Sequence, residues 1–311
     1  MTLNSKGKIP IAVVGSSSMV GSRFCELAKD DFNLIEADLG GKIPIDIINH
    51  QSVVEFFESH DFEWLILFSA FTDVDAAEKQ RNKKDGNCWQ VNVKGTKNVA
   101  AACRKHQKKL VYFSSDFIFD GKNGPYHEED KPAKKAREIS WYGWTKLKGE
   151  EAILDSGCQY LIARISYPYR AKFTAKVDFV RNIITRLKNR TLYPMFVDQF
   201  LTPTFIDDLA MALRQLIKSG EMGIYNLVDN TTLSAYSAAC DIAQAFGFDY
   251  NQIKKGRRSD FAKANPHAAP RPNLGGLLAT KINLKLLECG RIMRTFEESL
   301  SELKKQMGEI Q

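Results

Sequence analysis

Tyr142 and Lys146 are the residues whose types and spacing point most directly to chemistry. They stand four positions apart with helix formers after them, so they would share one face of a helix. An ammonium beside a phenol favours the phenolate, so we expect the pKa of Tyr142 to fall below its ordinary value of about 10. Ser115 follows an apolar segment and could hold a substrate carbonyl. These three side chains would suit proton transfer at a carbonyl oxygen.

The segment from Leu110 to Phe113 must place Ser115. It is a compact apolar run and predicts a buried strand. Ser114, Ser115 and Asp116 come directly after it, so they should lie at the end of this strand.

A second candidate feature is the turn that starts at Gly15. The β-branched run 8–14 predicts a strand, and a helix opens at about Gly21. Strand, small-residue turn and helix is the geometry that directs helix N-terminal amides at a phosphate. Ser18 stands where a dinucleotide fingerprint usually has its middle glycine. A turn without any ligand remains the alternative.

Asp38 follows the predicted strand 34–37 and stands 17 residues after Gly21. This is near the spacing of about 20 at which a carboxylate takes the ribose hydroxyls of an adenosine. A loop aspartate that caps a turn is the alternative. The charge of Asp38 favours NAD because it repels a 2′-phosphate, whereas Arg23 and Lys42 could receive that phosphate. Asp46 and Ile47 follow where an adenine ring could lie.

Small residues follow a third predicted strand, 64–68. Ser69 and Ala70 would let a nicotinamide ribose approach the backbone, although a plain loop is an equal alternative. Asn92 lies within a predicted helix, 87–104, where an asparagine usually satisfies a neighbouring backbone group.

Strands alternate with helices along the chain at intervals of roughly 25–30 residues, which predicts an α/β fold with a parallel, doubly wound sheet. Further strands are expected at 160–165, 192–200 and 223–228, and further helices at 178–190, 207–218, 233–246 and within 281–309.

The composition is that of a globular protein, with 311 residues, 44% of them hydrophobic and 26% charged. This length allows one large α/β domain and a smaller lobe. The net charge of +7 suits an anionic small-molecule substrate or a solvated surface. No apolar run approaches the roughly 20 residues of a membrane span. The six cysteines never pair at metal or redox spacing, which favours reduced thiols in the cytoplasm. We expect no metal, nucleic-acid or membrane partner.

The chain resembles the extended short-chain dehydrogenase/reductase family, and within it the dTDP-4-dehydrorhamnose reductases. The matching segments cover nearly all of residues 9–300 in the family's order. They are VVGSSSMVGS, FSAFTDVDAAE, VNVKGTKNVAAAC, SSDFIFDG, PYHEED, YGWTKLKGE, ARISYPY, DQFLTPT and APRPNLG. An ordered set of this kind is far more specific than a Tyr-Lys pair alone.

The resemblance implies a Rossmann-type fold and an NAD(P)-dependent reductase of a 4-keto nucleotide-diphosphate sugar, in carbohydrate biosynthesis. Tyr142 would donate the proton, Lys146 would assist it and hold the nicotinamide ribose, and Ser115 would orient the ketone. The NAD or NADP cofactor would contact Tyr142, Lys146, Gly15, Ser17, Ser18, Met19, Val20, Asp38, Asp46, Ile47, Phe68, Ser69, Ala70, Thr72, Asn92 and Ser114. The nucleotide-sugar substrate would meet Ser115, Asp116, Phe117, Tyr167, Gln199 and Arg271.

The family pattern also implies two domains and a possible homodimer. Residues 1–168 with 191–219 would form the dinucleotide-binding domain, and residues 169–190 with 220–311 the smaller α/β substrate lobe. Two alternatives stay open. One is a non-catalytic regulatory subunit, because the beta subunit of methionine adenosyltransferase has very similar motifs. The other is a nucleotide-sugar epimerase or dehydratase, although Phe117 offers no second carboxylate beside Asp116.

Overall fold

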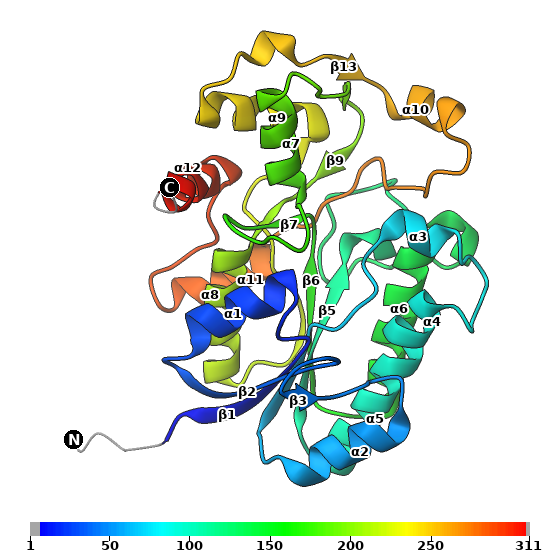
Figure 1. Ribbon diagram of the computed structural model, residues 1–311, viewed down its shortest axis with the longest axis vertical. Helices are drawn as coiled ribbons and strands as arrows, with labels where there is room; N and C mark the ends of the chain where they lie inside the picture. The colour runs from blue at the N-terminus through cyan, green and yellow to red at the C-terminus, as the bar shows by residue number, and fades with distance from the viewer. Residues whose placement is uncertain (1–6, 309–311) are drawn as a thin grey trace.

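A parallel sheet of seven strands forms the centre of the protein in the computed structural model, which describes residues 7–308 (Figure 1). The strand order is β11-β6-β5-β4-β1-β2-β3. The bounds are β1 Ile9–Val14, β2 Phe32–Asp38, β3 Ile43–Pro44, β4 Trp64–Leu67, β5 Lys109–Ser115, β6 Tyr160–Ile165 and β11 Gly223–Asn226. All four residues of β4 are buried, as expected for a central strand that is covered on both faces. The predicted α/β fold class is confirmed.

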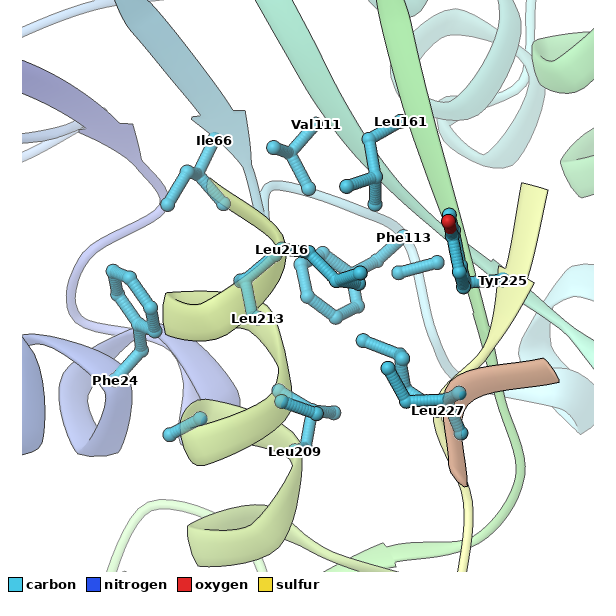
Figure 2. Close-up of a cluster of buried hydrophobic side chains, with 14 of the residues drawn as sticks. Phe24, Ile66, Val111, Phe113, Leu161, Leu209, Leu213, Leu216, Tyr225 and Leu227 are labelled. Atoms are coloured by element: carbon cyan, nitrogen blue, oxygen red, sulfur yellow. The ribbon is translucent and has the colours of Figure 1, made fainter. Parts of the chain in front are cut away.

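Helices cover both faces of this sheet (Figure 1). One layer contains α1 (Met19–Ala28), α8 (Ile206–Ser219) and α11 (Thr280–Leu287), and the other contains α2 (His50–Ser59), α5 (Thr96–Lys105) and α6 (Trp141–Ser156). Figure 2 shows the core beneath α8, where Leu213 and Leu216 meet Phe113 of β5 and Phe24 of α1. The two apolar layers fix the carboxyl edge of the sheet, where every predicted catalytic residue lies.

The predicted helix 87–104 is interrupted. It consists of α4 (Asn87–Trp89), a π-helix, η1 (Gln90–Gly95), and then α5. A π-turn inside an α-helix often marks a functional position. Here it contains Asn92, which is buried. The sequence pattern did not reveal the interruption because the apolar residues on either side keep helical spacing.

The smaller lobe is built around α7 (Phe179–Lys188), α9 (Ala235–Phe246) and α12 (Phe296–Gly308). Three short strand pairs accompany them. They are β7 (Pro168–Tyr169) with β10 (Thr204–Phe205), β9 (Phe200–Leu201) with β12 (Leu233–Ser234), and β8 (Met195–Phe196) with β13 (Lys255–Gly256). The remaining short elements are α3 (Val74–Glu78), η2 (Asp116–Ile118), η3 (Ala136–Glu138), η4 (Tyr250–Gln252) and α10 (Arg258–Ala264).

The prediction of one strand over 192–200 is wrong, because only 195–196 and 200–201 pair, each with a different partner. Pro194 has no amide to donate to a ladder, which shortens the first of these strands.

Two segments also differ from the predicted domain division. β11 pairs with β6 in the large sheet, although 220–311 was assigned to the lobe, and β8 and β9 pair with lobe strands, although 191–219 was assigned to the large domain. The division itself stays a prediction.

None of the helices within residues 7–308 combines the length and the apolar character that crossing a membrane requires.

Candidate active site

The start of α6 brings Tyr142 to the end of β5. Ser140 caps the helix, because its Oγ accepts a hydrogen bond of 3.1 Å from the amide of Gly143. A Cβ at Gly143 would collide with the carbonyl oxygen of Phe117, so only glycine lets the helix pass this close to the turn after β5. The ring of Phe117 lies 5.8 Å from that of Tyr142, centroid to centroid. The helix start and the strand end therefore form one site.

Ser115 lies between this phenol and Asp116. Its Oγ donates to Oδ1 of Asp116 at 3.1 Å and accepts from the amide of Phe117 at 3.3 Å. The contact between the rings of Phe117 and Tyr142 keeps the phenol near Ser115, and hydrogen bonding to Ser115 acts to lower the pKa of Tyr142. The hydroxyl of Ser166 donates to the other oxygen of Asp116 at 2.9 Å. The structure thus brings Ser115, Asp116 and Tyr142 together.

The expected fall in the pKa of Tyr142 is wrong. Burial raises the pKa of this phenol above its ordinary value, and the charge of Asp116 adds to the rise, while Ser115 opposes it. Lys146 is not among the groups that shift it. The physical reason is that the loss of hydration disfavours the phenolate more than its neighbours favour it. Tyr142 is accordingly a neutral phenol, the form that can donate a proton.

Lys146 is 2% exposed, and burial lowers its pKa from 10.5 to about 7, although the charge of Glu150 opposes the fall. Its Nζ lies 4.0 Å from the ring centroid of Tyr112 and makes no hydrogen bond or ion pair to any residue in 7–308. Glu150 is held in a buried ion pair with Arg164, with contacts of 3.0 and 2.8 Å. Lys146 thus retains three donor sites for a ligand.

Asp116 is an unusual carboxylate. It is 1% exposed, and burial raises its pKa from 3.8 to about 6, while hydrogen bonds from Ser166 and Ser115 oppose the rise. It forms no ion pair within the described chain. Phe117 follows it with an apolar ring at the position where a second carboxylate would be needed for acid–base elimination.

The turn after β1 has the geometry of a dinucleotide cradle. Gly15 has a φ of +87°, and a Cβ there would lie 2.5 Å from the amide nitrogen of Ser69. Ser18 caps α1 by accepting from the amide of Gly21 at 3.0 Å. The first intrahelical bond runs from Ser22 to the carbonyl of Ser18, so the amides of Met19 and Val20 have no partner within the helix. They are available to a pyrophosphate.

Asp38 is fixed beside this turn. Its Oδ2 accepts from the amide and the hydroxyl of Ser17 at 2.9 and 2.6 Å, and its Oδ1 accepts from the amide of Leu39 at 2.8 Å. Arg23 does not face this position, because its guanidinium binds Asp207 through two contacts of 2.7 Å. Of the two cations considered for a 2′-phosphate, Arg23 is therefore already engaged.

The residues expected near the adenine have local partners. Oδ1 of Asp46 accepts from the amide of Ile48 at 2.9 Å, and a Cβ at Gly95 would lie 2.7 Å from Cδ1 of Ile47. Ile47 therefore packs on η1, and Asn98 on α5 donates to its carbonyl at 2.9 Å.

Asn92 holds the loop that follows β4. Its side chain accepts from the amide of Phe71 at 2.8 Å and donates to the carbonyl of Phe71 at 3.1 Å. This is the backbone-satisfying role expected of it. Within the same loop, Ser69 and Ala70 are half-buried, and Thr72 is exposed and accepts from Nζ of Lys176 at 3.0 Å.

Two predicted cofactor residues have different surroundings. The ring of Phe68 stacks in the core on Phe113 at 4.6 Å, so only its backbone can face a ligand. Ser114 is 2% exposed, and its Oγ has no hydrogen-bond partner within residues 7–308. A buried hydroxyl without a partner is rare and marks a position where a ligand or a water would complete the bonding.

The predicted substrate residues gather on the lobe side of the site. Nε2 of Gln199 donates to the hydroxyl of Tyr167 at 3.1 Å. Burial and the charge of Asp116 raise the pKa of Tyr167 to about 12, against the effects of Arg271 and Arg258. Arg271 binds Asp75 of α3 at 2.8 and 3.3 Å.

The sequence analysis missed Arg258 and Asp75. A signal for Asp75 existed in the segment FSAFTDVDAAE, which was already matched to the family, whereas nothing in the sequence set Arg258 apart from neighbouring Arg257.

The observed features fit a bound dinucleotide. They are the Gly15 turn that admits no side chain, the unpaired first amides of α1, the fixed Asp38 and the partnerless hydroxyl of Ser114.

Comparisons with known proteins agree with this site. The probable low-salt glycan biosynthesis reductase Agl14 of Haloferax volcanii is 26% identical over 83% of this chain and 87% of its own length. Methionine adenosyltransferase 2 subunit beta of Pongo abelii is 29% identical over 63% of this chain and 58% of its own. The crystal structure of dTDP-4-dehydrorhamnose reductase from Bacillus anthracis in complex with NADP superimposes with a TM-score of 0.83, at 26% identity, and covers 96% of this chain and 100% of that one.

A family model supplies the decisive match. The RmlD substrate binding domain matches residues 9–308, which include the Gly15 turn, the Ser115–Tyr142–Lys146 group and the lobe. The chain therefore belongs to the RmlD substrate-binding-domain family.

Proposed function

We propose that this protein is an NAD(P)-dependent oxidoreductase that reduces the 4-keto group of a nucleotide-diphosphate sugar, with a dTDP-4-dehydrorhamnose-like substrate. The observation that carries the proposal is the packing of the start of α6 on the turn after β5, which sets the ring of Tyr142 5.8 Å from that of Phe117, two residues after Ser115, at the carboxyl edge of the sheet. Ligands bind at this edge in open α/β sheets. The similarity to the Bacillus anthracis reductase supports the substrate class.

The protein's part in the reaction is to deliver a proton. NAD(P)H supplies a hydride to the keto carbon when it is bound. When substrate binds, Ser115 would turn its one hydroxyl proton from Asp116 to the keto oxygen and so position that oxygen against Tyr142, which gives it its proton. Lys146 in its charged form would donate to the nicotinamide ribose, because its Nζ makes no hydrogen bond or ion pair within residues 7–308. Burial prepares the proton transfer because it keeps the phenol protonated until the oxygen becomes basic.

The proposed cofactor contacts are based on the turn after β1 and the residues around it. The Met19 and Val20 amides would hold the pyrophosphate, Asp38 would take the adenosine ribose, and Lys146 and Ser114 would meet the nicotinamide ribose. The charge of Asp38 favours NAD, whereas the Bacillus anthracis relative contains NADP, so we propose that both cofactors are accepted.

Replacing Tyr142 with phenylalanine tests the proposal. The variant should lose at least about 100-fold in turnover of dTDP-4-dehydrorhamnose, because a general acid contributes roughly 10²–10⁴-fold. Its affinity for NADH or NADPH, measured by fluorescence titration, should stay within about threefold of wild type, since the ring keeps its packing. Unchanged turnover would remove Tyr142 from the mechanism.

The two alternatives give different outcomes with the same protein. A regulatory subunit would bind the cofactor and oxidise no NAD(P)H with any 4-keto nucleotide-sugar. An epimerase or dehydratase would retain its cofactor through purification and convert substrate with no net oxidation. Phe117 beside Asp116 disfavours the dehydratase.

Two further expectations stay predictions. A homodimer would be detected by sedimentation. A cytoplasmic location is supported by the six cysteines, all of which are free thiols.

A further inference from the structure

Asp75 forms an ion pair with Arg271, the arginine that the proposed function assigns to substrate binding. Its carboxylate binds the guanidinium of Arg271 through both oxygens, at 2.8 and 3.3 Å. The same Oδ1 also accepts from the amide of Ala269 at 3.2 Å. Asp75 lies in the first turn of α3, in the loop region after β4, whereas Arg271 follows α10 in the lobe. Figure 1 shows α3 beside the segment that follows α10. The pair therefore joins α3 to the segment that follows α10.

A second arginine, Arg258, lies near Arg271. Its amide donates to Oδ1 of Asp198 at 2.9 Å, and Phe200, two residues further along, donates its amide to the carbonyl of Asn273 at 2.7 Å, so the segment 198–200 brings the two arginine-bearing segments together. The guanidinium of Arg258 makes no hydrogen bond or ion pair to any residue in 7–308. Burial and the positive charge of Arg271 lower the pKa of Arg258, while the charges of Tyr167 and Asp198 oppose the fall. Two half-buried guanidinium groups near one another repel, which favours additional anionic charge beside them.

Tyr167 locates these arginines relative to the reacting groups. Both Arg258 and Arg271 act on the pKa of its phenol, and its ring lies 6.3 Å from that of Phe117. Phe117 in turn contacts Tyr142. Gln199, which donates to the hydroxyl of Tyr167 at 3.1 Å, is next in sequence to Asp198, which binds the amide of Arg258, so the arginine segment lies beside Tyr167.

The contact between Asp75 and Arg271 is weak enough to be exchanged. The side chain of Asp75 is 56% exposed and that of Arg271 27% exposed. An ion pair with this exposure contributes little, at most a few-fold in an equilibrium constant. A diphosphate carries more charge than one carboxylate and has two phosphoryl groups, each of which can meet one guanidinium.

We propose that Asp75 is a specificity-determining residue, an internal counter-ion that holds Arg271 until a nucleoside diphosphate displaces it by engaging Arg271 and Arg258 together. This inference rests on the proposed function for the identity of the substrate class. A nucleoside monophosphate has one phosphoryl group and reaches only one of the arginines, so it competes poorly with Asp75. Asp75 thus increases the preference for nucleoside diphosphates over monophosphates, and it lowers the affinity for both.

The test is calorimetric titration of the full-length protein with dTDP and with dTMP, without cofactor or turnover. Asp75→Asn should tighten dTDP binding about two- to fivefold and narrow the preference for dTDP over dTMP, since the internal competitor has lost its charge. Arg258→Met should weaken dTDP about tenfold or more and change dTMP less. Asp73→Asn is the matched control, because it lies two residues away and keeps the N-cap of α3; it should change neither affinity.

Weaker or unchanged dTDP binding by Asp75→Asn would overturn the inference, and so would equal losses for both nucleotides in Arg258→Met. Failure of the proposed function is recognised separately. If the variants show the predicted affinities but the protein reduces no 4-keto sugar, the counter-ion role of Asp75 is supported and the reductase function is rejected. If the protein reduces the sugar but Asp75→Asn leaves the affinities and KM unchanged, the reductase function is supported and the counter-ion role is rejected.

Discussion

At the scale of single residues, burial decides the charge of every group in the site. It raises the pKa of Tyr142, lowers that of Lys146 to about 7 and raises that of Asp116 to about 6. The ordinary pKa values of these three groups are far from 7. In the site, Tyr142 is a neutral phenol, and the pKa values of Lys146 and Asp116 lie near 7. Such perturbed values are typical of catalytic sites. The sequence argument, which used only the neighbouring charge, obtained the wrong direction for Tyr142.

The lowered pKa of Lys146 predicts how activity depends on pH. The ammonium is charged below about pH 7 and neutral above it, so its charge-assisted hydrogen bonding to the nicotinamide ribose should fade as pH rises. We expect kcat/KM for NAD(P)H, which reports on the free enzyme, to fall through a midpoint near 7.

Lys146→Arg serves as the control, since its charge persists at every working pH and its residual activity should lack that midpoint. A wild-type profile that stays level from about pH 6 to 9 would contradict the role assigned to Lys146.

At the scale of elements, the sequence located the strand ends, the Gly15 turn and the helix of Tyr142, because buried parallel strands and amphipathic helices have strong periodic patterns. It did not locate η1, whose apolar spacing is that of an ordinary helix, or the short lobe strands, which pair for two residues each. It also missed Arg258 and Asp75, because their roles depend on residues far away in sequence. Asp75 binds Arg271, and the amide of Arg258 binds Asp198.

The π-helix η1 should matter for cofactor binding through Asn92. In Asn92→Ala the amide and carbonyl of Phe71 lose their partner, so the loop after β4 should loosen. We expect weaker NAD(P)H binding and a loss of about 1–3 kcal/mol in the free energy of unfolding. Fluorescence titration and urea denaturation measure the two effects.

Gln90→Ala gives a matched comparison within the same element. Its Nε2 donates to the carbonyl of Lys84 at 2.6 Å, away from the loop after β4. It should leave cofactor affinity unchanged. Equal effects of the two substitutions on NAD(P)H binding would contradict the role of Asn92.

At the scale of the whole molecule, the lobe is attached to the large domain by contacts of two kinds. Arg170, which is buried, donates to the carbonyl of Met19 at 3.2 Å and to Oγ of Ser22 at 2.9 Å, and it binds Glu26. It therefore fastens the lobe to α1 itself. The side chain of Arg170 is 8% exposed, against 27% for Arg271, so the contact with α1 is the better shielded of the two and should cost more to break. We therefore expect the Asp75–Arg271 pair, rather than the Arg170 contacts, to respond to substrate.

Transfer of a labelled hydride tests the central claim most directly. The protein is incubated with dTDP-4-dehydrorhamnose and NADH or NADPH in which both hydrogens at nicotinamide C4 are deuterium, and the sugar is analysed by NMR. A reductase places one deuterium on C4 of the sugar for each cofactor oxidised, and Tyr142→Phe should abolish this transfer. A sugar that stays unlabelled while the wild-type protein binds both ligands would contradict the reductase.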